Sequence, residues 1–251
     1  MRHIHDDSVQ ALIHISQRLA GECARLRFTA AAAVYNPLVY ARTAHEKYLR
    51  LYGAPPKKII FLGMNPGPWG MAQTGVPFGE IAAVRDWLGI TAEVDKPRHE
   101  HPMRPVSGFA CTKSEVSGRR LWGFFRERFK TPEAFFQDHF VANYCPLVFM
   151  TESGANLTPD KLPAEEAAPL FKVCDRALAD VIQLLRPQWV VGVGGFAAKR
   201  IDAAAALNAG DNPVSFRKAQ ILHPSPANPK ANAGWGKEAA DILLRTGVWE
   251  N

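Results

Sequence analysis

Four short, mainly apolar runs mark the chain, and stretches with helical periodicity lie between them. The runs cover residues 59–62, 140–144, 189–193 and 219–222. Runs of this length are typical of strands that are buried on both faces of a parallel sheet. The pattern therefore predicts a single α/β domain over residues 1–251, a three-layer α/β/α sandwich around a central four-stranded parallel sheet.

Helices are expected before, between and after these strands. Apolar positions at helical spacing predict helices over residues 9–28, 43–52, 80–88, 117–129, 131–139, 164–185, 196–207 and 237–245. Thr131 followed by Pro132 is a typical helix start, and Gly53 is a typical helix end. Residues 1–30 are predicted to form an N-terminal helical extension, which could serve as an added docking helix.

Composition narrows the class of protein. Of the 251 residues, 47% are hydrophobic, yet no run reaches the about 18 apolar residues that a membrane span requires. The start of the chain is polar and acidic, unlike a signal peptide. An intracellular protein is therefore expected, cytoplasmic and nucleoid-associated in a bacterium or nuclear in a eukaryote.

The formal net charge of the chain is +6, and the excess is local. Residues 96–130 hold nine Lys or Arg side chains against three acidic ones. Part of this stretch falls in residues 91–117, where three prolines and the lack of periodicity predict a long basic loop. Basic surfaces attract polyanions and steer association with nucleic acid. A solvated basic face without any partner is the other interpretation.

The four cysteines are far apart in the sequence and form no C-x-x-C pair. They are Cys23, Cys111, Cys145 and Cys174. A zinc site or an iron–sulfur cluster would require the fold to gather them. We therefore expect reduced, mostly buried thiols, and we expect neither a metal nor a cofactor.

A stiff loop follows the first predicted strand and marks the expected working edge of the sheet. Residues 57–80 contain this strand and then a loop with five glycines and three prolines. Glycine lets a backbone approach a ligand closely, and proline stiffens the path of the chain. Asn65, Asn143 and His223 stand at the carboxyl ends of three predicted strands, which share one edge of a parallel sheet. We expect these three side chains to converge on one site.

Two other segments carry weaker signals. Residues 192–197 (GVGGFA) fit the G-x-G-x-x-A fingerprint that can seat a dinucleotide pyrophosphate. Asp211 has the spacing of the acid that this fingerprint requires, but it precedes the next strand, so close packing of strand on helix is the favoured interpretation. The loop HPSPANPKANAGW, residues 223–235, is either a rigid wedge for DNA or an ordinary proline-stiffened turn.

Seven segments form a recognisable set: GMNPGPWGMAQTGVPFGE, NYCPLVF, HPSPANPKANAGW, YNPLVYA, VRDWLGI, SEVSGRRLWGFFR and SGANLTP. Together they resemble the single-strand-selective monofunctional uracil-DNA glycosylase family over residues 35–235. The resemblance implies a uracil-DNA glycosylase-like fold. It also implies a metal-independent DNA repair enzyme that flips out uracil and 5-modified uracils from single- and double-stranded DNA and hydrolyses them, with no lyase step.

The same resemblance implies how the base is held. Asn143 matches the asparagine that reads uracil, because its amide can accept from N3–H while it donates to O4. Phe78 matches the aromatic ring on which the base stacks. Gly67 and Met71 match main-chain positions beside the 5-position of the base, and Met64 is assigned to the same pocket.

Two residues are implied to carry the catalysis. His223 matches the donor to uracil O2 as negative charge forms on the departing base. Asn65 matches the residue that positions the water, since an amide cannot act as a general base near neutral pH. The motif assigns no lysine as a nucleophile, which agrees with hydrolysis without strand cleavage.

The wedge of the family corresponds to residues 224–231, and Ala227 stands where relatives carry a longer basic side chain. The residues assigned to DNA contact are Pro224, Ser225, Pro226, Ala227, Asn228, Pro229, Lys230, Ser117 and Arg119. The expected protein is a monomer that binds uracil-containing DNA and no membrane. A non-catalytic DNA- or nucleotide-binding α/β module is the alternative from a different class.

Overall fold

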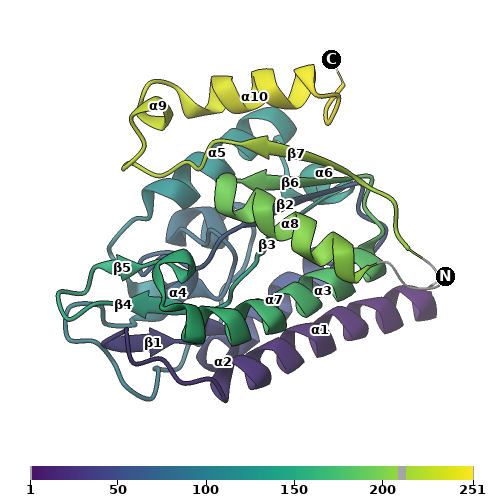
Figure 1. Ribbon diagram of the computed structural model, residues 1–251. Helices are drawn as coiled ribbons and strands as arrows, with labels where there is room; N and C mark the ends of the chain where they lie inside the picture. The colour runs from purple at the N-terminus through teal and green to yellow at the C-terminus, as the bar shows by residue number, and fades with distance from the viewer. Residues whose placement is uncertain (1, 209–212, 251) are drawn as a thin grey trace.

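The computed structural model describes residues 2–208 and 213–250. At its centre lies a four-stranded parallel sheet in the order β3, β2, β6, β7 (Figure 1). The strands are β2 (Ile59–Gly63), β3 (His139–Asn143), β6 (Trp189–Val193) and β7 (Arg217–Ile221). Each begins within two residues of its predicted start, so the predicted parallel sheet is confirmed. Asp211, the candidate acid of the dinucleotide fingerprint, lies outside the described residues.

Helices cover both faces of this sheet (Figure 1). The long helices are α1 (Arg2–Ala24), α3 (Arg42–Tyr52), α5 (Val116–Phe129), α7 (Ala164–Leu185), α8 (Gly195–Leu207) and α10 (Trp235–Arg245). Successive side chains of β2 point to the two opposite helical layers. Leu62 faces a cavity that it shares with α1, α3 and α7, whereas the ring of Phe61 lies 4.9 Å from the ring of Phe125 in α5. The three-layer α/β/α arrangement is therefore as predicted.

The remaining helical segments are short. They are α2 (Pro37–Tyr40), α4 (Met71–Thr74), α6 (Pro132–Phe136), α9 (Pro229–Asn232), the π-turn η1 (Ala83–Trp87) and the 3-10 turns η2 (Gly108–Ala110) and η3 (Pro159–Lys161). The predicted helix 131–139 ends early as α6, because His139 already pairs with Ile59 in the sheet. Thr131 caps α6 as expected, accepting a hydrogen bond from the Ala134 amide.

A second, smaller sheet was not predicted. It is antiparallel in the order β1, β4, β5. Its strands are β1 (Ala33–Tyr35), β4 (Val148–Met150) and β5 (Asn156–Leu157). Strands of two or three residues are too short to show the alternation of apolar and polar positions by which strands are recognised in a sequence.

The first helix spans residues 2–24 rather than the predicted 9–28, and it contributes to the main core. Leu12, Ile13 and Cys23 are each 2–3% exposed. The helix packs along α7, as Figure 1 shows at the lower edge of the molecule. A role of this segment as an added docking helix stays a prediction.

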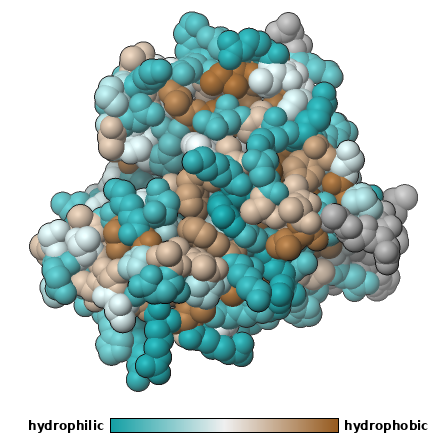
Figure 2. Space-filling model, viewed as in Figure 1, coloured by the Kyte–Doolittle hydropathy of each residue, from teal (hydrophilic) through white to brown (hydrophobic). Residues whose placement is uncertain are grey.

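The glycine-rich turn between β6 and α8 serves close packing. A Cβ atom on Gly192 would lie 2.6 Å from the Ala198 nitrogen, so only glycine lets α8 approach the strand this closely. Figure 2 shows that hydrophilic residues cover most of the viewed face and that hydrophobic residues form small separate patches. Within the described part of the chain, no helix has the length and apolar character of a membrane span.

All four cysteines carry free thiols, and three of them lie in the protein interior. Cys23, Cys145 and Cys174 are buried, while Cys111 is half-buried. This confirms the expectation of mostly buried thiols. Among residues 2–208 and 213–250, no group of three or more His, Cys, Asp or Glu side chains is arranged to hold a metal ion.

Candidate active site

The candidate site lies at the carboxyl edge of the parallel sheet. Asn143 is the last residue of β3 and pairs in register with Gly63, the last residue of β2. Asn65 and His223 each follow the end of a strand by two residues. The chain segments that follow β2 and β3 remain side by side beyond the sheet, because the Tyr144 amide donates to the Gly63 carbonyl at 2.9 Å.

Gly63 is the point at which the predicted base-binding residues meet. A Cβ atom here would overlap the Asn143 Oδ1 atom and would lie 2.5 Å from Cε2 of Phe78. The Phe78 ring lies in turn 6.0 Å from the ring of His223, at an interplanar angle of 36°. The structure therefore brings Asn143, Phe78 and His223 together, and the absence of a side chain at position 63 makes this approach possible.

Phe78 is held in an unusual backbone conformation. Its φ angle is 52°, in the left-handed region that a bulky residue rarely adopts, at a cost of about 1–3 kcal/mol. Its carbonyl accepts hydrogen bonds from the Trp122 indole at 3.0 Å and from the Glu80 amide at 2.8 Å. A Cβ atom on Gly118 would overlap the same carbonyl. Helix α5 thus holds the main chain of Phe78 in place.

The amide of Asn143 is oriented by a weak partner. Its Nδ2 donates to the sulfur of Met71 at 3.3 Å, and a thioether is only a weak acceptor. The side chain of Met71 is 2% exposed and fills the wall beside the amide. A ligand carbonyl could therefore take over the donor without leaving a strong acceptor unsatisfied.

Asn65 stands at the same edge and is anchored to the loop after β3. Its Nδ2 donates to the Leu147 carbonyl at 3.1 Å and to the Pro66 carbonyl at 3.4 Å. Both donor bonds use the amide nitrogen, which leaves Oδ1 available as an acceptor. The main-chain carbonyl of the neighbouring residue, Met64, accepts a hydrogen bond from the Cys145 amide at 2.8 Å.

His223 is the second residue of the loop after β7, and its ring is neutral near pH 7. Desolvation by the surrounding protein lowers the pKa of His223 to about 4. No hydrogen bond from any described residue reaches the ring, so both ring nitrogens remain available to a ligand. Gly194, with φ of 94°, allows this position, because a Cβ atom there would lie 3.2 Å from the His223 Cβ.

The loop predicted as a wedge is tied to α5 by an arginine that the sequence analysis missed. Arg120 donates to the Pro224 carbonyl at 3.1 Å and to Asn232 Oδ1 at 2.8 Å. Asn232 in turn donates to the Pro226 carbonyl at 2.9 Å. Arg119, which was assigned to DNA contact, is exposed and has no side-chain partner among the described residues.

The predicted wedge residues differ in exposure. Pro224 is buried at the base of the loop, and Ser225 and Asn228 are half-buried. Asn228 caps α9 by accepting from the Lys230 amide at 3.1 Å. The exposed members are Pro226, Ala227, Pro229 and Lys230. The loop therefore presents two prolines, a methyl group and one amine to solvent, while Ser117 stays half-buried at the start of α5.

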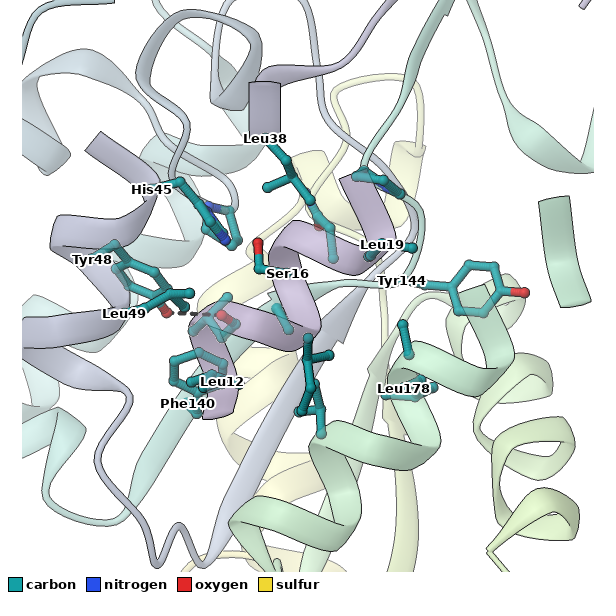
Figure 3. Close-up of a pocket in the computed structure, with 18 of the residues that line it drawn as sticks. Leu12, Ser16, Leu19, Leu38, His45, Tyr48, Leu49, Phe140, Tyr144 and Leu178 are labelled. Atoms are coloured by element: carbon teal, nitrogen blue, oxygen red, sulfur yellow. Dashed lines mark hydrogen bonds between the residues drawn. The ribbon is translucent and has the colours of Figure 1, made fainter. Parts of the chain in front are cut away.

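An apolar cavity of about 80 Å³ lies behind the site (Figure 3). Leu12 and Leu19 of α1, Tyr48 of α3 and Leu178 of α7 line it. Asn143 is also among its lining residues. The position of α1 over this cavity was not foreseen, because helix packing depends on side chains that are distant in sequence. Helix α1 thus contributes side chains to a cavity that also borders the candidate site.

The chain is similar to known proteins of one superfamily. Residues 51–243 match the profile of the Uracil DNA glycosylase superfamily. Over 232 residues the chain is 49% identical to the single-strand selective monofunctional uracil-DNA glycosylase of Rattus norvegicus, a match that covers 92% of this chain and 82% of the rat protein. The protein of the same name from Bos taurus is 48% identical over 232 residues, which cover 92% of this chain and 84% of the bovine one.

A solved structure shares the fold. The crystal structure of wild-type SMUG2 from Pedobacter heparinus aligns with a TM-score of 0.60 at 14% sequence identity, covering 93% of this chain and 97% of that one. At this identity the likeness concerns the fold alone.

Proposed function

The chain belongs to the uracil DNA glycosylase superfamily, and on that premise we propose that it is a DNA repair enzyme that excises uracil from DNA by hydrolysis. The observation that carries this proposal is the packing of Asn143 and Phe78 on the bare backbone of Gly63, with the His223 ring beside the Phe78 ring. The product would be an abasic site, formed without strand cleavage. Uracil and 5-modified uracils in single- and double-stranded DNA are the proposed substrates.

Recognition of the base follows from the Asn143 amide. Its Oδ1 can accept from uracil N3–H, and its Nδ2 can leave the Met71 sulfur to donate to O4. Cytosine offers an acceptor at N3 and donors at its exocyclic amine, so both atoms of the amide would face the wrong partner. Buried polar groups left unpaired in this way can give a large discrimination. The ring of Phe78 supplies the stacking surface.

His223 is proposed to stabilise the departing base. Breaking the N-glycosidic bond leaves negative charge on uracil and positive charge on the sugar. A neutral imidazole can donate to O2 as the charge forms, and the low pKa of His223 keeps the ring in this neutral form. Since the ring binds no described residue, no existing hydrogen bond has to be broken first.

Asn65 is proposed to hold the attacking water. Its two donor bonds to main-chain carbonyls fix the direction of the amide, and its free Oδ1 points away from them as an acceptor. Orientation of the water is sufficient where the sugar already carries positive charge. The role is that of a positioning group, because an amide does not take a proton near neutral pH.

The protruding loop at residues 224–231 is proposed to support the flipped state in duplex DNA. Taking a base out of the stack costs a few kcal/mol, and an inserted wedge can offset part of this cost. Pro226, Ala227 and Pro229 are exposed and stiff enough for the role. We further propose that the whole chain acts as one domain, located in the nucleus or nucleoid.

The test is an abasic-site assay. The protein is incubated in a metal chelator with uracil-containing single- or double-stranded oligonucleotides, and alkali then cleaves any abasic site. We expect cleavage at the uracil position only after alkali treatment. DNA binding without any abasic site would favour the alternative, a non-catalytic DNA-binding module. Loss of activity in the chelator would indicate a metal site.

Asn65→Ala should slow excision strongly while DNA binding is retained, because the residue is proposed to act on the water and not on the base. The measurement is a single-turnover rate together with a fluorescence-anisotropy Kd. Full excision by this variant would remove Asn65 from its role without refuting the glycosylase activity.

A further inference from the structure

Three glycines leave room for one carboxyl group beside the candidate base pocket. Glu115 precedes helix α5, and a Cβ atom placed on Gly67 or on Gly70 would overlap its carboxyl oxygens. A Cβ atom on Gly118 would lie 3.1 Å from Glu115 Oε2. The turn at residues 67–70 therefore packs directly on this carboxyl group. The same turn carries Gly67 and leads into Met71, both of which belong to the proposed pocket.

The surroundings of the carboxyl group are unfavourable for a negative charge. Its Oε2 atom is inaccessible to solvent and has no hydrogen-bond partner among the described residues. Glu80, itself bonded to Ser114 Oγ at 3.0 Å, is the nearby charged group whose field acts on it. Leaving such a polar atom unpaired costs about 1–3 kcal/mol. A residue retained at that cost needs an explanation beyond packing.

Cations near this region are engaged elsewhere or face solvent. Arg120 binds the loop after β7, and Arg119 is exposed. Arg104 lies over the ring of Trp69, 5.2 Å from its centre. No described Lys or Arg forms an ion pair with Glu115. The carboxyl group therefore has no neutralising partner.

We propose that Glu115 is a positioning residue for the base pocket, which seats the 67–70 turn and so places the main chain of Gly67 and Met71 beside the 5-position of the base. The proposal rests on the proposed excision of uracil. Helix α5 would then set both walls of the pocket, since Trp122 and Gly118 already fix Phe78. Glu115 itself touches no reacting atom.

The seating works with the protonated carboxyl group. Burial, and after it the charge of Glu80, raise the pKa of Glu115 to about 7. Above that pH the group ionises without a partner and must draw in water or move away from the turn. The pocket then loses its support on the Gly67 side. This predicts that excision weakens as pH rises above about 7 through poorer binding of the flipped base.

The main experiment compares three proteins: the native chain, Glu115→Gln, and Glu127→Gln as a matched control. Gln has the shape of a protonated Glu and cannot ionise. Glu127 is exposed in helix α5, so its variant makes the same replacement of a carboxyl group by an amide away from the pocket. For each protein, kcat and KM for a uracil-containing single strand are measured from pH 5.5 to 9.

Native protein and the control should lose roughly tenfold in kcat/KM between pH 6.5 and 8.5, mostly as a rise in KM. Glu115→Gln should keep its low KM across this range. The ratio of kcat/KM for the native chain to kcat/KM for Glu115→Gln cancels any effect of pH on the DNA or on His223. A Gln variant with the same pH profile as the native chain would overturn the proposal.

A second arm alters the pKa of Glu115 without touching it. Glu80→Gln removes the neighbouring negative charge, so the carboxyl group should ionise at lower pH and the rise in KM should begin earlier. An unchanged midpoint in Glu80→Gln would also count against the proposal.

A stability measurement separates positioning from a merely structural effect. The folded protein binds this proton and the unfolded chain does not between pH 4.5 and 7, so the native urea midpoint should fall relative to Glu115→Gln over that window and level off above it. If the urea midpoints change with pH in this way but KM does not change with pH, then Glu115 has only a packing role and the proposal is wrong. If the native chain excises no uracil, the proposed function fails, and the urea data still report whether the group is protonated.

Discussion

Two loops reach the candidate pocket, and the protein holds them in different ways. The loop after β2 is held by hydrogen bonds of a buried side chain. Gln73, which is fully buried, donates to the Pro68 carbonyl at 2.9 Å and to the Pro105 carbonyl at 3.0 Å. The loop after β7 is held by hydrogen bonds near the surface. Arg120 and Asn232, the side chains that brace it, bond across the molecular surface.

The difference separates two tasks. Groups that read a base must be held in place before the base arrives, since a displacement of 1 Å costs much of the rate. A segment that fills a duplex must instead adapt to DNA that is itself being deformed. Changes in the loop after β2 should therefore affect every substrate. Changes in the loop after β7 should affect duplex DNA more than single strands.

The largest effect is expected at His223, where the two regions meet. Because His223→Ala removes the donor to O2 in every substrate, it should lower the single-turnover rate by about 10²–10³-fold on single strands and duplexes alike. DNA binding should be retained. His14→Ala, which removes an exposed histidine of α1, is the control and should have the native rate. A His223→Ala rate within twofold of native would contradict the assigned role.

Gly63→Ala should have the next largest effect. The new methyl group would overlap Asn143 Oδ1 and the Phe78 ring, so both must shift. We expect kcat/KM to fall about 10- to 100-fold on both kinds of DNA. The matched control is Gly123→Ala in α5, where a Cβ atom meets nothing within 4 Å. Equal activity of the two variants would show that the pocket is not preformed.

Arg120→Ala tests the other loop. Loss of its bonds to Pro224 and Asn232 should loosen the wedge and slow excision about 3- to 10-fold in duplex DNA, with little effect on single strands. Arg119→Ala removes the same charge from the neighbouring position without breaking a bond. If Arg119→Ala had the larger effect on duplex DNA, direct contact with phosphate would outweigh the bracing.

The smallest effect concerns pH at saturating enzyme. Since burial holds the pKa of His223 at about 4, its ring stays neutral above pH 5. The single-turnover rate should therefore change by less than about twofold between pH 5.5 and 8. A rate that falls as pH rises through 6.5 would mean that the protonated ring is the active form.

Much of the fold could be predicted, because β2 and β6, the two central strands of the parallel sheet, are apolar runs of five residues. The boundaries of α7 and β6 agree with the prediction to the residue. The sheet of β1, β4 and β5 could not be predicted, since its strands are two or three residues long. The contacts that support the pocket could not be predicted either. Trp122 contacts Phe78 only in the folded chain. The sequence also does not show which of the two adjacent arginines points toward the loop after β7.

For the candidate site, the positions of residues along the chain could be used to predict a shared location, but the contacts between their side chains could not be predicted. Asn65, Asn143 and His223 follow strand ends, and parallel strands share one edge, so their common location could be derived. The strained φ of Phe78 and the overlap at Gly63 depend on atoms of several elements. Glu115 carried no signal, because an acid before a helix is ordinary until the glycines around it are seen together.

The most direct test is a crystal structure of the protein with free uracil. We predict that the base stacks on the Phe78 ring, with N3 and O4 on the Asn143 amide and O2 toward the His223 imidazole, while the backbone of residues 63–80 stays unmoved. Uracil bound elsewhere, or bound here only after that backbone has rearranged, would contradict a preformed pocket for the base.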